Sequence, residues 1–198
     1  LPPVVAGFGP AGMFAALILA RSGHCPIVVE RGRDIDARTD DVNNFWTNRI
    51  LDETSNIQYG EGGAGTFSDG KLTTGIKDSR CRFVFEEFVS HGAPEDILTN
   101  AKPHIGTDKL KTTVKAIREE IISLDEERNA LQGEQIALNT ELEKFRSWGD
   151  FDPGSISPLI EKGIDISFYE IPKAEYNNLG ESVKTVKLEQ TKSSVKCL

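Results

Sequence analysis

Three glycines with the spacing of a dinucleotide-binding motif lie near the start of this 198-residue chain, in Gly-Phe-Gly-Pro-Ala-Gly at positions 7–12. An apolar run at positions 3–6, rich in β-branched residues, precedes the motif, and the apolar stretch 13–20 follows it. These patterns are typical of a strand and a buried helix. A second apolar run, 26–29, is followed at once by Glu30. We therefore expect two neighbouring parallel strands joined through a glycine turn and a helix.

Each position of the glycine turn has a physical role in binding a pyrophosphate. Gly7 would permit the tight turn, Gly9 would leave room for phosphates beside the backbone, and Gly12 would let the helix pack close to the strand. Pro10 and Ala11 would open the helix, whose free N–H groups and positive dipole end favour an anion. The turn is therefore a candidate phosphate-binding site.

Glu30 lies 18 residues after Gly12, close to the distance at which dinucleotide-binding proteins carry an acidic residue at the end of the second strand. Its carboxylate could accept hydrogen bonds from both ribose hydroxyls of an adenosine, and its charge would repel a 2′-phosphate. Alternatively, the glycines form a turn in an unrelated α/β unit and Glu30 is only solvated. The motif by itself does not distinguish FAD from NAD.

A second glycine-rich segment follows at residues 60–72 and contains five glycines within eleven residues. Such a sequence forms neither a helix nor a regular strand, and its consecutive backbone N–H groups suit an anion or a flat ring that approaches closely. The alternative is a flexible surface loop. The candidate binding residues here, together with Arg31 next to Glu30, are Gly62, Gly63, Gly65, Ser68 and Lys71.

Residues 4–121 resemble the bacterial FAD-dependent dehydrogenases of the NAD(P)/FAD-utilising oxidoreductase superfamily. The matching segments are Val5–Gly12, Val29–Gly32, Gly60–Leu72, Gly92–Glu95 and Ala101–Leu110. The resemblance implies that Gly7, Gly9, Gly12 and Glu30 bind the ADP half of FAD. It also implies that residues 62–71 lie beside the pyrophosphate and flavin, with NAD(P)H as an electron donor. The expected function is that of an FAD-binding oxidoreductase.

This resemblance ends near Ile122. Proteins of this kind continue with a third parallel strand, a β-meander and a distant Gly-Asp segment beneath the flavin, and none of these follows here. We therefore expect a fragment whose flavin site is incomplete for catalysis. No catalytic residue is assigned: His104 could donate a proton near a flavin, but a packed or solvated loop histidine is the simpler interpretation.

Apolar residues continue at alternating spacings of four and three from Leu110 to Phe145, which is a helical seam with a period of 3.5 residues. Thr107 or Asp108 is a plausible N-cap. Arg128 and Gln135 interrupt the seam. We thus expect a coiled-coil stalk that could self-associate through the helix at 107–145, with residues 123–147 as its separate helical or coiled-coil segment. The alternative is an amphipathic helix, or a helical hairpin broken at residues 132–133, that packs on its own domain.

The remaining residues, 148–198, predict a small α+β lobe with a short helix at 153–162 and strands at 164–169 and 184–189. Residues 126–171 resemble the cytoplasmic region of subunit I of V/A-type rotary ATPases, through the charged helix, Trp-Gly-Asp-Phe at 148–151 and Glu-Lys-Gly-Ile at 161–164. That resemblance implies an alternative function as a structural interaction element. Trp148 and Phe151 are most simply core anchors.

Composition narrows the function classes further. The chain carries 31 acidic and 23 basic residues, a net charge of −8, which argues against nucleic-acid binding. Its longest wholly apolar run, 13–20, is too short to span a membrane. Three cysteines without a Cys-x-x-Cys pair predict neither disulfides nor a metal site and favour the cytoplasm.

The overall expectation is an α/β chain with three parts: a partial Rossmann-like FAD-binding domain at residues 1–122, the helical segment 123–147, and the lobe 148–198. The two resemblances meet near residue 122, as in a chimera of two unrelated fragments. A first residue Leu1 in place of Met also indicates a fragment.

Overall fold

The structure is a computed structural model that describes residues 1–72, 74–146, 148–149, 152–164, 166–180 and 182–198. The chain forms two compact units, Leu1–Leu131 and Gln132–Leu198. Both contain helices and short strands, so the fold is mixed α/β, with one long helix and two small sheets. Each unit is described by itself below.

The first unit opens with strand β1 (Val4–Ala6), helix α1 (Pro10–Arg21) and strand β2 (Ile27–Val29). The two strands pair in parallel, which confirms the predicted order of strand, glycine turn, helix and strand. Helix α1 ends where Gly23 adopts a φ of +77°, as glycine commonly does one or two residues beyond a helix. Val4, Ile27 and Val29 leave one apolar face of this sheet exposed, although parallel sheets are normally covered on both faces.

Further helices of the first unit surround this β–α–β element. They are α2 (Ile35–Asn48), the 3-10 helix η1 (Ala64–Phe67), α3 (Arg80–Ser90) and the 3-10 helix η2 (Glu95–Leu98). Helix α2 was not expected from the sequence. It is capped by Asp34, whose carboxylate accepts hydrogen bonds from the N–H groups of Asp36 and Ala37 at 3.0 and 3.1 Å.

The longest helix, α4, runs from Thr107 to Arg146. The expected N-cap, Thr107 or Asp108, is off by at least one residue, because Thr107 is already helical and the Gly106 carbonyl accepts the first helical hydrogen bond, from the Leu110 N–H. The helix passes through Gly133 without the break that a hairpin would require. Leu110, Val114, Ile117 and Ile121 are buried on one face of its first turns. Nearly every residue after Ile121 is exposed, so this helix packs on its own domain in one half only.

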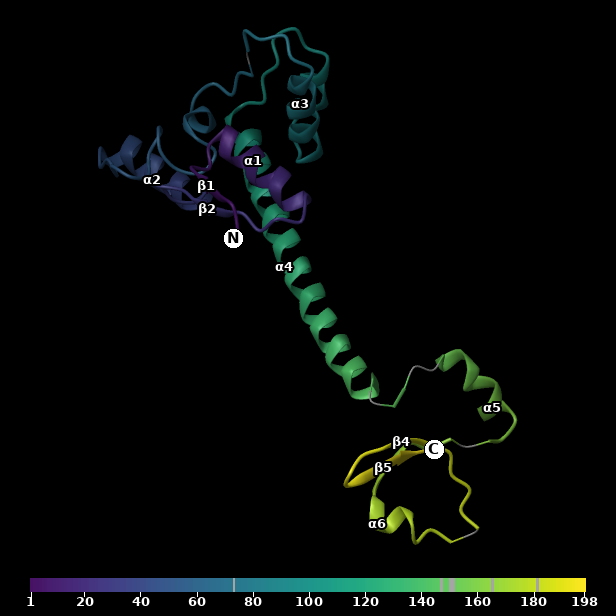
Figure 1. Ribbon diagram of the computed structural model, residues 1–198. Helices are drawn as coiled ribbons and strands as arrows, with labels where there is room; N and C mark the ends of the chain where they lie inside the picture. The colour runs from purple at the N-terminus through teal and green to yellow at the C-terminus, as the bar shows by residue number, and fades with distance from the viewer. Residues whose placement is uncertain (73, 147, 150–151, 165, 181) are drawn as a thin grey trace. The chain divides into compact units, whose positions relative to one another are not determined.

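The main core of the first unit lies where α1, α3 and α4 meet. Figure 1 shows α1 beside the first half of α4, and the buried side chains come from both helices, from α3 and from β1. At the surface above this core, the Arg21 guanidinium binds the carboxylates of Glu87 and Glu120. Nε2 of His91 lies 2.7 Å from Glu120. The hydrogen bond from Arg21 lowers the pKa of Glu120. Because Arg21, Glu87 and Glu120 lie on α1, α3 and α4, this polar cluster joins three helices.

The second unit contains a three-stranded antiparallel sheet. Its elements after α4 are listed in chain order: the 3-10 helix η3 (Pro153–Ser155), α5 (Ser157–Glu161), β3 (Tyr169–Pro172), α6 (Lys173–Tyr176), β4 (Lys187–Gln190) and β5 (Ser194–Cys197). Strand β5 lies between β3 and β4, and its Val195 and Cys197 are buried.

The predicted elements of this lobe are only partly confirmed. A short helix follows Pro153, as expected, but the strand predicted at 164–169 begins only at Tyr169, and the strand predicted at 184–189 is Lys187–Gln190. The Trp148 ring packs edge-on against Phe168 with ring centroids 5.5 Å apart, consistent with an anchoring role. Phe151 lies outside the described residues.

Candidate functional site

The glycine turn between β1 and α1 depends on two glycines for different reasons. Gly7 has a φ of +86°, which side chains other than glycine rarely allow, and its N–H donates to the Val29 carbonyl at 2.7 Å. A Cβ atom on Gly12 would clash with the carbonyl oxygen of Gly7 and crowd Val5. The turn and the close approach of α1 to β1 are therefore built as the sequence predicted.

Gly9 differs from these two residues because the fold does not require a glycine there. It is the N-cap of α1 with φ −75° and ψ −176°, an ordinary extended conformation. A Cβ atom at this position would meet only the Cα of Gly63, at an unstrained 3.8 Å. No side chain caps the helix, so the N–H groups of its first turn remain available to an anion.

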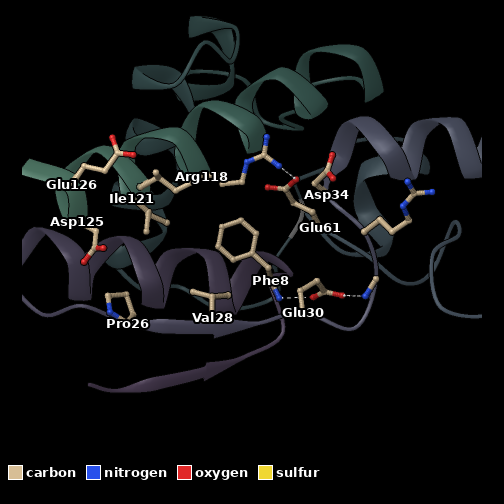
Figure 2. Close-up of a pocket in the computed structure, with 13 residues that line it drawn as sticks. Phe8, Pro26, Val28, Glu30, Asp34, Glu61, Arg118, Ile121, Asp125 and Glu126 are labelled. Carbon is tan, nitrogen blue, oxygen red and sulfur yellow. Dashed lines mark hydrogen bonds and ion pairs between the residues drawn. The ribbon is translucent and has the colours of Figure 1, made fainter. Parts of the chain in front are cut away.

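The Glu30 carboxylate, at the end of β2, accepts a hydrogen bond from the backbone of the glycine turn. Its Oε2 accepts the Phe8 N–H at 2.6 Å, and its Oε1 accepts the Gly32 N–H at 2.9 Å. These bonds fix the side chain at the end of β2, as Figure 2 shows. Because an ionised carboxylate offers about four acceptor positions, two remain for external donors such as ribose hydroxyls.

The second glycine-rich segment packs directly against the turn. The Gly62 N–H donates to the Phe8 carbonyl at 2.8 Å, and a Cβ atom on Gly63 would approach Cδ of Pro10 and Cα of Gly9 at 3.1 and 3.3 Å. Residues 64–67 form η1, so the segment is a loop that contains one short helical turn. The structure thus brings the two predicted glycine segments together.

Arg38 organises this loop and was missed by the sequence reasoning. Its side chain is fully buried and donates to the backbone carbonyls of Asn56, Ile57, Glu61 and Gly63. Burial lowers the pKa of the guanidinium, which these carbonyls satisfy in place of water. A signal was present, since Arg38 shares one face of its helix with the buried Ile35 and Val42.

Glu61 is a second buried charged residue in the loop, with 3% of its surface exposed. Its Oε2 accepts the Ile35 N–H at 2.5 Å and pairs with the Arg118 guanidinium at 2.8 Å. Burial raises the pKa of its carboxyl. The ion pair joins the loop to α4, so this helix helps to hold the site.

A pocket of about 500 Å³ lies beside Glu30. Figure 2 shows Phe8 between Val28 on one side and Ile121 and Arg118 on the other. Five carboxylates and two guanidinium groups surround these apolar side chains. The excess of negative charge favours an uncharged polar ligand group over a phosphate. The remaining residues that line the pocket are Pro26, Gly32, Arg33, Asp34, Glu61, Ile122, Asp125 and Glu126.

A second pocket, of about 470 Å³, opens at the start of α1. Pro10, Ala11, Gly62, Gly65 and Lys71 line one part of it. The rest is mainly apolar, including Met13, Phe14, Leu72, Val84, Phe85, Phe88, Leu110 and Val114. Residues of the glycine turn therefore line both pockets, and the second one has the apolar walls that suit a flat ring.

Three candidate residues lie farther from this arrangement. The Arg31 guanidinium stacks 4.5 Å from the centre of the Tyr59 ring. Ser68 is exposed, and its hydroxyl donates to the Gly65 carbonyl at 3.2 Å. Lys71 pairs with Asp69 at 2.6 Å and forms a backbone bridge with His104, which is exposed. Of the three, only Lys71 lines a pocket described here.

Comparison with known proteins gives one informative relative. No family model matches the chain. An uncharacterised protein of Clostridium beijerinckii is 50% identical over 165 residues, which is 83% of this chain and 29% of the relative. The chain thus spans less than a third of that protein's length. Because the matched stretch is longer than the 122 residues of the first expected part, it must cross residue 122.

Among the described residues, no helix is both long enough and apolar enough to cross a membrane.

Proposed function

We propose that the first unit binds the ADP half of FAD as part of an oxidoreductase resembling the FAD-dependent dehydrogenases. The observation that carries this proposal is the placement of Glu30 and the uncapped start of α1 at a single glycine turn. The pyrophosphate would lie against the N–H groups that follow Gly9, and the ribose hydroxyls would bind Glu30. Gly9 is consistent with this arrangement, since its backbone conformation and its surroundings would accept a side chain, whereas a pyrophosphate beside it would not.

The two pockets fit the two ends of such a cofactor. The pocket beside Glu30 offers apolar walls and hydrogen-bond acceptors to an adenosine. The pocket beside Ala11 offers mainly apolar walls and the backbone of the glycine loop to a flavin ring. A bound flavin would supply the redox chemistry, and the residues of this chain would bind and orient it.

The proposed site is incomplete for catalysis. The exposed apolar face of β1 and β2 is where a parallel sheet would normally be covered, and the Clostridium relative is more than three times as long as the region it shares with this chain. We therefore propose a cofactor-binding role, with substrate and any catalytic residue outside the residues assigned here. NAD(P)H remains the proposed electron donor of the intact enzyme.

Calorimetric titration of the full chain with AMP and with 2′,5′-ADP, which differ only by the 2′-phosphate, tests the role of Glu30. Wild type should prefer AMP, because the carboxylate repels the added phosphate. Glu30→Gln should bind AMP more weakly and lose this preference, and the exposed Glu53→Gln should change neither property. Equal affinity of wild type for both nucleotides would refute the assignment of Glu30.

A second role is proposed for α4 as an interaction element. The supporting observation is that Leu131, Leu138, Leu142 and Phe145 are all more than half exposed on one helix. Sedimentation equilibrium of the full chain should detect self-association, and Leu138→Asp should abolish it. A monomer at all concentrations would remove this role and leave the FAD proposal untouched.

A further inference from the structure

The apolar seam of α4 is buried in its first part and exposed in its second part. Its first part, Leu110 to Ile121, is buried in the core of the first unit. The same seven-residue repeat continues through Leu124, Leu131, Leu138 and Phe145 at the heptad position called d. The last three of these are 58%, 58% and 53% exposed, and Leu142 at position a is 67% exposed. An apolar stripe of this kind is buried when a second helix packs along it.

We propose that residues 124–145 of α4 form a parallel, in-register coiled coil with the same residues of a second copy of the chain. This proposal rests on the interaction role proposed above and is independent of FAD binding. Identical d positions would face one another in four layers, so one sequence supplies both halves of the seam. The charges beside the seam decide the direction of the partner helix.

All three g positions that flank this seam are glutamates: Glu127, Glu134 and Glu141. In an antiparallel pair, g positions face g positions, so these carboxylates would oppose one another and repel. In a parallel pair, g faces e of the next heptad, which is Gln132, Asn139 or Arg146. The parallel arrangement therefore removes the repulsion.

The parallel arrangement also creates one attractive pair. Glu141 would lie opposite the partner's Arg146, and the reverse pair forms by symmetry. Within its own helix, Arg146 binds Glu143 at 2.6 Å, but both side chains are largely exposed. Because exposed pairs contribute little, Arg146 can exchange this partner for Glu141 of the second helix at small cost.

Arg128 and Gln135 occupy the two polar a positions of the seam. In the parallel register, Arg128 would lie next to the partner's Glu127, so its charge has a carboxylate within reach. Its own-chain neighbour Asp125 is 3.7 Å away. Polar a residues weaken a coiled coil while fixing its register and number of strands. We therefore expect a weak dimer whose register is set by these two layers.

Disulfide trapping in the full chain tests the direction. In the parallel register, Leu131 faces Leu131 and Leu142 faces Leu142. Of the two antiparallel registers with the most overlap, one places Leu131 against Leu142 and the other places Leu124 against Leu142, so Leu142 lies about 16 or 27 Å along the axis from its own copy. Disulfides need Cα atoms within about 7 Å. Under a glutathione redox buffer, Leu131→Cys and Leu142→Cys should each cross-link with themselves.

Thr140→Cys, at position f on the opposite side of the helix, is the matched control and should not cross-link. Wild type serves as a second control, because it shows any cross-linking by the three native cysteines, which lie outside the seam. Sedimentation equilibrium is run beside the trapping, where Arg128→Ile should tighten the dimer at least tenfold. Cross-links that form only in a mixture of Leu131→Cys and Leu142→Cys would overturn the parallel direction. A monomeric wild type would overturn the coiled coil itself.

Discussion

Substitution of Gly9 separates a glycine that the ligand needs from one that the fold needs. Gly9 has a φ of −75°, and a Cβ atom there meets only Gly63, at 3.8 Å. Alanine is a poorer N-cap than glycine by up to about 1 kcal/mol, but it also restricts the unfolded chain by about 0.4–1 kcal/mol. The two effects nearly cancel. We therefore expect Gly9→Ala to change the free energy of unfolding by no more than about 0.5 kcal/mol.

Binding should respond much more strongly than stability. A side chain at position 9 fills the space that the pyrophosphate requires, so Gly9→Ala should weaken FAD binding and Gly9→Val should weaken it at least tenfold, about 1.4 kcal/mol. Glu30→Gln should lose less affinity, because the amide still accepts one hydrogen bond. Calorimetric titration gives the affinities, and thermal unfolding followed by circular dichroism gives the stabilities.

Two other glycines provide the controls for this experiment. A Cβ atom on Gly75 meets nothing within 4 Å, so Gly75→Ala should leave binding unchanged and should raise stability by about 0.4–1 kcal/mol through the unfolded chain. Gly12→Ala should destabilise the fold, because its Cβ atom would clash with the backbone of Gly7. If Gly9→Val folds and binds FAD as tightly as wild type, the turn does not hold a pyrophosphate and the reasoning fails.

Three further predictions concern the loop and α4. Arg38→Met should lower the free energy of unfolding in urea by about 2–4 kcal/mol, because it leaves buried carbonyls without donors. The control Arg33→Met, at an exposed arginine, should lower it by under about 0.5 kcal/mol. Burial raises the pKa of Glu61 above its usual 4.5, so the folded chain holds this proton more tightly than the unfolded chain. As pH rises above 4.5, wild type should therefore lose stability relative to Glu61→Gln, and an opposite slope in urea midpoints would contradict this. Gly133→Ala fills open space in an exposed helix interior and should stabilise α4 by about 1 kcal/mol, seen as helical circular dichroism retained to higher temperature.

The elements that the sequence predicted well are those set by local patterns. Gly7 and Gly12 stand between two β-branched runs and an apolar helix, and this short-range order is enough to predict β1, α1 and β2. The 3.5-residue repeat predicted α4 for the same reason. The repeat did not show which half would be buried, because burial of Ile117 depends on α1 and α3 folding over it.

The features that the sequence did not predict depend on contacts between distant residues. Arg38 is buried because carbonyls 18 to 25 residues away converge on it, and an isolated arginine normally indicates a surface position. The strand predicted at 184–189 spans only Lys187–Gln190, and because all four of its residues are exposed, no alternation of buried and exposed residues marks its bounds. The two predicted glycine segments were recognised separately, and only the fold shows that Gly63 lies against Gly9.

The expected junction near residue 122 is also informative. Helix α4 passes through this position without interruption, and the 165 residues shared with the Clostridium protein must extend across it. A related sequence therefore continues across position 122 in a second protein.

Competition among FAD, ADP and FMN for the purified full chain tests the central proposal most directly. The ADP half of the cofactor should supply the recognition, because Glu30 and the start of α1 both face that half in the proposed arrangement. Isothermal titration should therefore show FAD binding that ADP displaces and FMN does not. Absence of FAD binding, or displacement by FMN and not by ADP, would contradict the assignment of the glycine turn as the site for the ADP half of FAD.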